Sequence, residues 1–383
     1  MRKEIVSVLC VVAALVAAPV MAAEGESYLS QPRFLMATFD GPPAAAPEAP
    51  AVAAAPVMED FSCSGCNHVD CCCPSWRLGA SVEATFFWPT VNGTSTYTEL
   101  GSISGGTLTT NTYDAGSEQT DDLFAAPRIW IGAKRDCWGI GTRFWWMDQC
   151  VSSQSDTISP TSFFTIDREL EAYTIDLELT RDVCVLGNEA MLSAGIRYGR
   201  VENGASAITN VNWNPIGAPA LTSATATSLR EFGGTGPTFA AQGTRQIRCS
   251  NFHVFWGARG SVLFGDGYVG AITSATAVDA VNGPSATQTN FGLAGGDGAA
   301  FLGELQLGLQ YERQLACVPC TAFVRGAFEY QYWNTDYNSS AASWSLAGVS
   351  TAGGPSYGAY STAAASGLEL DLIGFTVGTG LTW

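Results

Sequence analysis

The residues best suited to chemistry stand between Ser62 and Pro74, where the sequence reads SCSGCNHVDCCCP. Five cysteines lie there within eleven residues, beside one of the only two histidines: Cys63, Cys66, Cys71, Cys72, Cys73 and His68. Such a cluster can bind a metal ion, run a dithiol redox cycle or form disulfides. The spacing of the cysteines has to separate these three chemistries.

The sequence Cys63-x-x-Cys66 has the spacing of two zinc ligands, with His68 close by. Three consecutive cysteines, however, cannot all aim their side chains at one ion. A redox CxxC motif normally opens a helix, and no helix is indicated here. We therefore predict disulfides, with a zinc site or free thiols as the alternatives, and we predict no resident metal or other cofactor. The pairing of the cysteines cannot be read from the sequence.

Nothing in the sequence pairs a nucleophile with a base, as catalysis would require. The second histidine, His253, lies near a predicted turn, far in sequence from His68. We therefore expect no catalytic residues and no enzymatic activity.

The first 75 residues form three segments of different composition. Residues 1–23 run from charged to apolar to small residues, which is the pattern of a secretory signal peptide. Residues 24–60 are rich in proline and alanine, which predicts a disordered leader. Residues 61–75 carry the cysteine cluster. Export would place these cysteines in an oxidising compartment, where disulfides persist.

The composition limits the classes of protein that this chain can belong to. Charged residues make up only 14%, against about 25% in an ordinary soluble domain, and 46% of residues are hydrophobic. After the signal peptide no apolar run reaches the ~18 residues of a spanning helix, so any membrane span must use strands. The net charge of −17 repels phosphate backbones and argues against a nucleic-acid partner.

From Trp76 onward, apolar and polar residues alternate, which predicts strands with one apolar and one polar face. In WRLGASVEATFFW, for example, Leu78, Val82 and Phe86 alternate with polar and small residues. Most such segments reach the ~9–11 residues that a tilted strand needs to cross a bilayer. We find ten of them: 76–91, 123–134, 137–149, 168–181, 189–202, 229–245, 251–265, 301–313, 321–333 and 368–383.

The connections between these segments alternate in length. The long ones are 92–122, 150–167, 203–228, 266–300 and 334–367, and the short ones are 135–136, 182–188, 246–250 and 314–320. This asymmetry is typical of an all-β, transmembrane, antiparallel up-and-down β-barrel with long extracellular loops and short periplasmic turns. We predict about ten strands in residues 76–383, or twelve if β-branched residues at 208–211 and 268–281 form a further hairpin. A water-soluble β-sandwich is the alternative.

This topology places three groups of side chains. The polar parity should face the lumen, where charges would either tune an aqueous pore or pair and stiffen the barrel. The candidate lumen residues are Arg77, Glu83, Arg128, Arg143, Asp176, Glu178, Arg197, Arg259, Glu304, Arg325 and Glu329. Aromatic residues near the strand ends should form membrane girdles. These are Trp88, Trp146, Tyr198 and Tyr332 near the long loops, and Trp138, Tyr311 and Trp383 near the turns.

The third group is the remaining cysteines, five of which fall at the short turns: Cys137, Cys184, Cys249, Cys317 and Cys320. The cysteine cluster emerges at the same periplasmic end, so these ten residues are our disulfide candidates. Such bonds would close the periplasmic mouth or join neighbouring molecules. Only Cys150 is predicted at the opposite end.

The last strand, LIGFTVGTGLTW, carries Phe375, Val377 and Leu381 on one parity and ends in Trp383. It resembles the carboxy-terminal strand by which Gram-negative outer-membrane proteins are recognised for assembly. Together with RIWIGAKRDCWGIGTRFWWMDQ, YTIDLELTRD, MLSAGIRYGR and GTGPTFAAQG, it makes residues 76–383 similar to the pore-forming Legionella-type major outer membrane protein family. The resemblance implies residence in the outer membrane, contact with its lipid and delivery by the barrel-assembly machinery.

The resemblance implies a pore, and ten strands imply a narrow one, since open aqueous porins use 16–18 strands. We therefore expect a narrow pore or porin for small solutes or ions. The alternative is a structural or adhesive surface barrel cross-linked by disulfides, associating with itself as an oligomer or lattice. An outer-membrane enzyme is the least favoured class.

Overall fold

The computed structural model describes most of the chain beyond the leader, and all described residues belong to one compact unit, Cys63–Trp383. The described ranges are 73–104, 107–114, 123–159, 162–185, 188–213, 220–248, 250–279, 285–315, 320–336, 340–350 and 356–382. The expected signal peptide and proline-rich leader, and all but the last cysteine of the cluster, lie outside them. No helix in these ranges could span a membrane.

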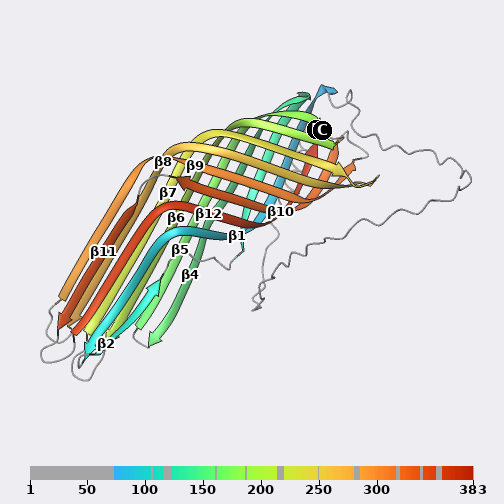
Figure 1. Ribbon diagram of the computed structural model, residues 1–383. Helices are drawn as coiled ribbons and strands as arrows, with labels where there is room; N and C mark the ends of the chain where they lie inside the picture. Colours follow the sequence, from blue (N-terminus) through green and yellow to red (C-terminus); the bar gives the residue numbers. More distant parts are fainter. Residues whose placement is uncertain are drawn as a thin grey trace, which may run out of the picture. The chain divides into compact units, whose positions relative to one another are not determined.

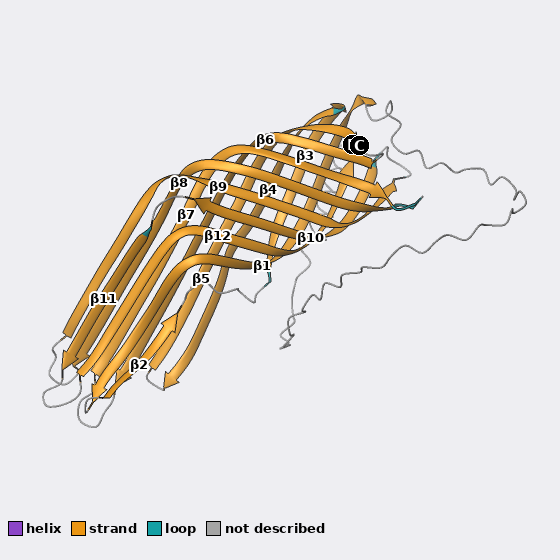
Figure 2. Ribbon diagram, viewed as in Figure 1, coloured by secondary structure: helices purple, strands orange, loops and turns teal. Residues whose placement is uncertain are grey.

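Twelve antiparallel strands make up the described structure (Figures 1 and 2). They are β1 (Cys73–Ser104), β2 (Thr107–Asp114), β3 (Phe124–Asp136), β4 (Trp138–Ser159), β5 (Ser162–Val185), β6 (Asn188–Trp213), β7 (Ala220–Gln246), β8 (Phe252–Asp279), β9 (Ser285–Gln314), β10 (Thr321–Asp336), β11 (Ala341–Ser350) and β12 (Ser356–Thr382).

Ten of these strands close a barrel. Each of β3 to β10 pairs with its neighbour in sequence, and β12 joins β10 to β1, which in turn pairs with β3. Following the paired residues once around the ring from Gly79 leads back to β1 at Val91, twelve positions further on. Such a stagger tilts the strands, as closure of a barrel requires. The predicted fold is thus confirmed.

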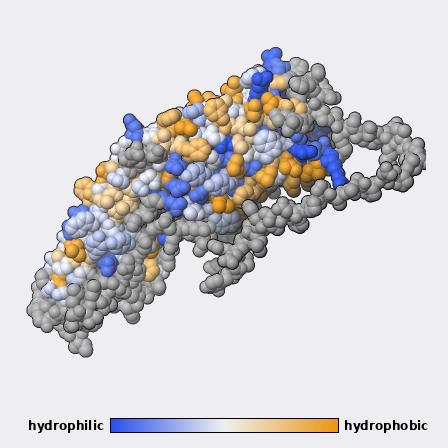
Figure 3. Space-filling view, viewed as in Figure 1, coloured by the Kyte–Doolittle hydropathy of each residue, from blue (hydrophilic) through white to orange (hydrophobic). Residues whose placement is uncertain are grey.

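The alternation of side chains also follows the prediction. On β1, Glu83 and Thr85 are buried inside, whereas Leu78 and Trp88 are exposed outside. The apolar face is turned outward along most of each ring strand, so that hydrophobic side chains cover much of the barrel wall (Figure 3). An outward apolar face is stable in lipid, because exposing so much apolar surface to water would be unfavourable.

The segments expected to be long loops are mostly strands. β5 and β6 continue to residues 162 and 213, and β8 and β9 continue to residues 279 and 285. Within the stretches where a hidden hairpin was considered, 208–211 and 268–281, residues 208–211 instead extend β6 and residues 268–279 extend β8. The two additional strands are β2, paired with β1, and β11, paired with β12. Threonine and other β-branched residues in these segments favour extended backbone. The sequence analysis assigned the segments to loops because they are also rich in Gly and Ser.

We call this outer part of the sheet the distal segment; it comprises residues 94–104, 107–114, 150–159, 162–169, 203–213, 220–228, 266–279, 285–298, 341–350 and 356–365. Its opposite walls touch. Thr96 Oγ1 on β1 donates a hydrogen bond to Ser228 Oγ on β7 at 2.8 Å, and the hydroxyls of Thr98 and Thr209 lie 2.5 Å apart. The distal segment thus consists of two sheet layers packed against each other. Among the described residues, a sandwich-like arrangement is found in this segment, next to the barrel.

Candidate functional site in the barrel lumen

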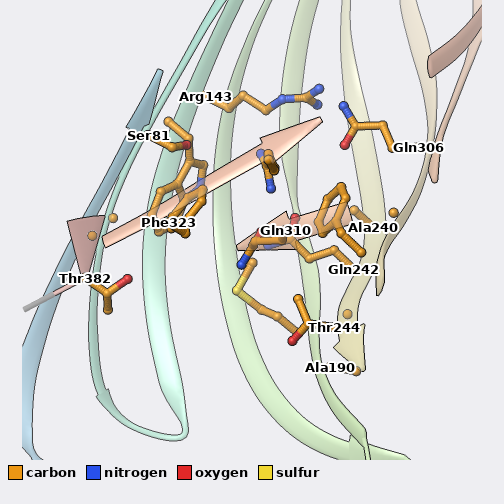
Figure 4. Close-up of a pocket in the computed structure, with 18 of the residues that line it drawn as sticks. Ser81, Arg143, Ala190, Ala240, Gln242, Thr244, Gln306, Gln310, Phe323 and Thr382 are labelled. Carbon is orange, nitrogen blue, oxygen red and sulfur yellow. The ribbon is translucent and has the colours of Figure 1, made fainter. Parts of the chain in front are cut away.

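The lumen contains three layers, and the first is a cavity at the turn end. Its volume is about 520 Å³. Three glutamines, Gln242, Gln306 and Gln310, and the ring of Phe323 point into it, with Arg143 at its inner end (Figure 4). The cavity is polar: charged side chains line it beside the amides and a few aromatic rings, among them Lys134, Glu178 and Arg259, so it borders directly on the ion pairs.

The second layer is a network of ion pairs that crosses the lumen. Arg143 on β4 reaches Glu304 on β9, with Nη2 2.6 Å from Oε2. Arg197 on β6 binds Asp176 through two contacts of 2.6 and 2.8 Å, and its Nη1 lies 2.7 Å from Glu304. Arg259 on β8 pairs with Asp176 at 3.3 Å and with Glu178. Asp176 and Arg197 are register partners on the neighbouring strands β5 and β6, whereas the β4–β9, β6–β9 and β5–β8 pairs join strands that are not ring neighbours and so bridge the interior.

A second group of ion pairs in the same layer is centred on Arg128 and Glu329. Arg128 Nη1 donates to Glu83 Oε2 at 2.9 Å and to Glu329 Oε2 at 3.0 Å. Glu329 also accepts hydrogen bonds from Gln306 and Gln331, both at 2.7 Å, and Arg325 pairs with Glu83. Saturation of carboxylate lone pairs by several donors is what allows charges to be buried.

Ten of the eleven predicted lumen residues therefore lie in two ion-pair clusters, and Arg77 is exposed at the turn end. One cluster contains Arg128, Arg325, Glu83 and Glu329, the other Arg143, Arg197, Arg259, Asp176, Glu178 and Glu304, so the formal charges cancel within each. Of the two roles considered for the inward charges, the geometry is that of a paired ladder.

The third layer is apolar and lies just beyond the ion pairs. Trp145 of β4 is 2% exposed, and its ring lies 6.3 Å from Phe87 of β1 and 6.0 Å from Trp333 of β10. Met147, Phe232, Leu263, Leu302, Leu368, Leu370 and Leu372 are buried in the same cluster. Rings from β1, β4 and β10 meet here, so side chains of the described residues fill the lumen at this level.

The sequence analysis missed the apolar layer, although the sequence contains a signal for it. The strand pattern loses its alternation at Phe86-Phe87-Trp88, Trp145-Trp146-Met147 and Tyr332-Trp333, where both parities are apolar. Two apolar faces at one level indicate a strand that is buried on both sides. The outward member of each group lies on the outer face and the inward member fills the lumen.

Six of the seven predicted girdle residues are described, and all six lie at least partly exposed on the outer face. Trp146 pairs in register with Tyr173, whose ring lies 5.9 Å from that of Tyr198. Trp88, Trp138 and Tyr311 are likewise exposed, and Tyr332 packs 6.5 Å from Phe301. Trp146 lies eight positions after Trp138, which corresponds to roughly 27 Å of strand. This length suits a tilted strand that crosses a bilayer. Trp383 lies outside the described residues.

The cysteines at the turns differ from one another. Cys137 is in a disulfide. Cys73, the last residue of the cluster, pairs through its backbone with Asp136, the neighbour of Cys137. Cys320, a predicted disulfide partner, is instead a free thiol that is 6% exposed. Cys63, Cys66, Cys71, Cys72, Cys249 and Cys317 lie outside the described residues, so pairing across the whole set stays a prediction.

The burial of Cys320 gives an expected pattern of thiol labelling. Because Cys320 has almost no contact with solvent, an aqueous maleimide should leave it unmodified in the folded chain and modify it after unfolding. Mass mapping of the peptide that contains Cys317 and Cys320, with fragmentation to place the label, measures this. Full labelling of Cys320 without unfolding would contradict the buried position.

His253 lies inside the turn end, with Nδ1 3.2 Å from Glu312 Oε1. Among the described residues, no three His, Cys, Asp or Glu side chains are placed to hold a metal ion. The lumen site therefore offers paired charges, amides and aromatic rings.

No protein-family model matches the sequence, and no curated protein matches it. Solved structures with a similar fold are outer-membrane barrels. The outer membrane protease OmpT from Escherichia coli covers 79% of this chain and 96% of its own, with a TM-score of 0.28 and 11% identity. A Pseudomonas aeruginosa FadL homologue covers 80% and 90%, with a TM-score of 0.25 and 12% identity. Ail, the attachment invasion locus protein of Yersinia pestis, covers 77% and 98%, with a TM-score of 0.16 and 10% identity.

The closed ring of ten strands with its apolar outer face is a transmembrane-type β-barrel in its own right, and at these identities and TM-scores the likenesses transfer no activity. They do correct one expectation. We expected no enzymatic activity, but a protease is among the similar barrels, so this conclusion from sequence is wrong and catalysis is left open.

Proposed function

We propose that the chain is a structural surface barrel of the outer membrane, with a closed lumen and a distal segment that it holds rigidly beyond the membrane. The observation that carries this proposal is the filled lumen. The ion-pair layer and the apolar layer follow one another directly, and side chains from strands across the ring meet in both. Outer-membrane lipid would surround the barrel, and the carboxy-terminal strand would direct its assembly.

The distal segment supports the same proposal. Its two walls are joined by hydroxyl pairs, and Arg230 of β7 donates hydrogen bonds to Asn92 O of β1 at 2.6 Å and to Asn203 Oδ1 of β6 at 2.7 Å. A buried arginine that ties three strands together favours a stiff projection over a flexible loop. Rigid surfaces suit interaction, because less conformational freedom is lost on binding.

Planar-bilayer recording tests the closed lumen. We expect no discrete conductance steps from the full chain, because water and ions would have to cross a packed apolar layer. Folded protein is verified beforehand by its heat-modifiable mobility on a gel. Regular steps from folded protein under oxidising conditions would contradict the proposal.

A narrow pore for small solutes or ions is the second candidate. Two observations favour it: the polar cavity at the turn end and the resemblance of residues 76–383 to a pore-forming family. The same recording separates the candidates when repeated after reduction. Steps that appear only after the disulfides are reduced would support a pore whose periplasmic mouth the cysteine cluster closes.

A further inference from the structure

Four exposed arginines lie on the outer face of the barrel at its turn end, one on the first strand of each hairpin that a short turn closes. We call them the arginine belt: Arg135 of β3, Arg181 of β5, Arg245 of β7 and Arg313 of β9. Each lies within four residues of the end of its strand. In Figure 3, strongly hydrophilic residues border the apolar wall at this end. The belt thus places a positive charge on every second strand over much of the ring.

Two of the belt arginines are placed on the outer face by a shared neighbour. Arg135 and Arg181 are both paired in register with Trp138, which is exposed on the outer wall. Directly opposite residues of an antiparallel pair point to the same side of the sheet. The guanidinium of Arg181 lies over the Trp138 ring, 5.0 Å from its centre. This cation–π contact holds the charge at the edge of the apolar wall.

The other two belt arginines follow the outward parity of their strands. Arg313 comes two positions after the exposed Tyr311, and Arg245 comes six positions after the exposed Phe239. Because side chains alternate along a strand, both arginines stand on the outer face, closer to the turns than these aromatic residues. The belt therefore continues directly from the apolar wall.

The acidic residues of the turn end do not neutralise the belt. Asp182 and Glu189 line the cavity in the lumen, and Glu312 contacts His253 inside the turn end. Asp136 is the last residue of β3, at the turn itself. No ion pair between described residues includes a belt arginine. The outer face of the turn end therefore carries a surplus of positive charge, in a chain whose net charge is −17.

The opposite edge of the wall has the opposite charge. There the outward-facing Arg200 lies between Glu202 and Glu231, with contacts of 3.2 and 2.8 Å. Asp266 and Asp297 face each other in register on β8 and β9, and both are exposed. The outer face of the described strands is thus basic at the turn end and acidic at the other end.

From these observations we infer that the arginine belt binds the phosphate groups of anionic phospholipids. The lipids belong to the leaflet at the turn end, which is the periplasmic leaflet in the predicted orientation. A guanidinium presents a planar fork of N–H donors that matches phosphate oxygens. Its aliphatic stem can lie along the apolar wall while the charge reaches the headgroups.

The position of the belt favours lipid over a soluble partner. The belt is continuous with the wall that faces lipid, so headgroups are the first anions beside it. Juxtamembrane basic residues are attracted to anionic lipids, and each additional arginine strengthens this attraction. The inference does not depend on whether the lumen conducts.

Native mass spectrometry of the full chain in detergent, titrated with phosphatidylglycerol or with zwitterionic phosphatidylcholine, tests the inference. We expect the unchanged chain to bind phosphatidylglycerol more tightly than phosphatidylcholine. A quadruple variant that replaces every belt arginine with glutamine should bind phosphatidylglycerol roughly tenfold or more weakly, with its binding of phosphatidylcholine unchanged. Added salt should weaken the binding of phosphatidylglycerol to the unchanged chain, because ions screen exposed charges.

A pair of single variants supplies the matched control. Arg181→Gln should show part of the loss, whereas Arg200→Gln should leave the binding of phosphatidylglycerol unchanged. Both arginines are on the outer face, but Arg200 lies at the opposite edge and is already paired with carboxylates. Heat-modifiable mobility on a gel confirms that each variant folds.

Equal affinity of the unchanged chain for the two lipids, or a preference for phosphatidylglycerol that the quadruple variant retains, would overturn the inference. Sedimentation with purified peptidoglycan tests a different anionic partner. Co-sedimentation that depends on the belt, without lipid binding that depends on it, would assign the belt to the cell wall and reject the lipid.

Discussion

Replacing Arg197 with Met should lower the free energy of unfolding by about 3–5 kcal/mol, because the substitution leaves buried carboxylates without their partner. Arg197 is fully buried and binds both Asp176 and Glu304. Methionine fills a similar volume, so the loss reports mainly the missing charge. Equilibrium unfolding in urea, followed by tryptophan fluorescence of the lipid-embedded barrel, measures the change.

The control for this variant lies three residues further along β6, on its outer face. Arg200 pairs with Glu202 at 3.2 Å and with Glu231 at 2.8 Å, but its side chain is 38% exposed. Water screens such pairs, so Arg200→Met should cost about 1 kcal/mol or less. If the two substitutions lower the free energy of unfolding equally, the ion pairs in the lumen are hydrated like surface pairs. That result would indicate an open, water-filled channel.

The contrast between these two arginines shows what the sequence can predict. Alternation along the strand placed Arg197 inside, because a period of two assigns each residue to a face. It could not show that Arg197 meets Glu304, since that contact joins β6 to β9 across the lumen and depends on strand stagger. The stagger follows from closure of the ring, a property of all ten strands together.

The boundaries between strands and loops could not be predicted from the sequence either. Residues 266–279 of β8 contain glycine, alanine, serine and threonine, a composition shared by loops and by extended sheets. Their strand character comes from pairing with β7 and β9 and from contact between the two walls of the distal segment, which are long-range interactions.

Replacing Trp145 with Ala should destabilise the barrel by about 3–5 kcal/mol, as expected when a large buried aromatic side chain is removed and its site cannot collapse. The ring of Trp145 packs between Phe87 and Trp333, and its Nε1 donates to Thr85 Oγ1 at 3.3 Å. The loss would appear in urea unfolding followed by the shift in gel mobility, which does not depend on tryptophan fluorescence.

Trp146→Ala is the matched comparison, since this neighbour has the same side chain and faces lipid, 40% exposed. Lipid can fill the space that the Trp146 ring leaves, whereas nothing can enter the closed apolar layer at Trp145, so the second substitution should cost much less. If both variants lose the same stability, the interior at Trp145 is filled with water rather than side chains. The lumen would then not be closed, and a hydrated pore would replace the structural role as the proposed function of this barrel.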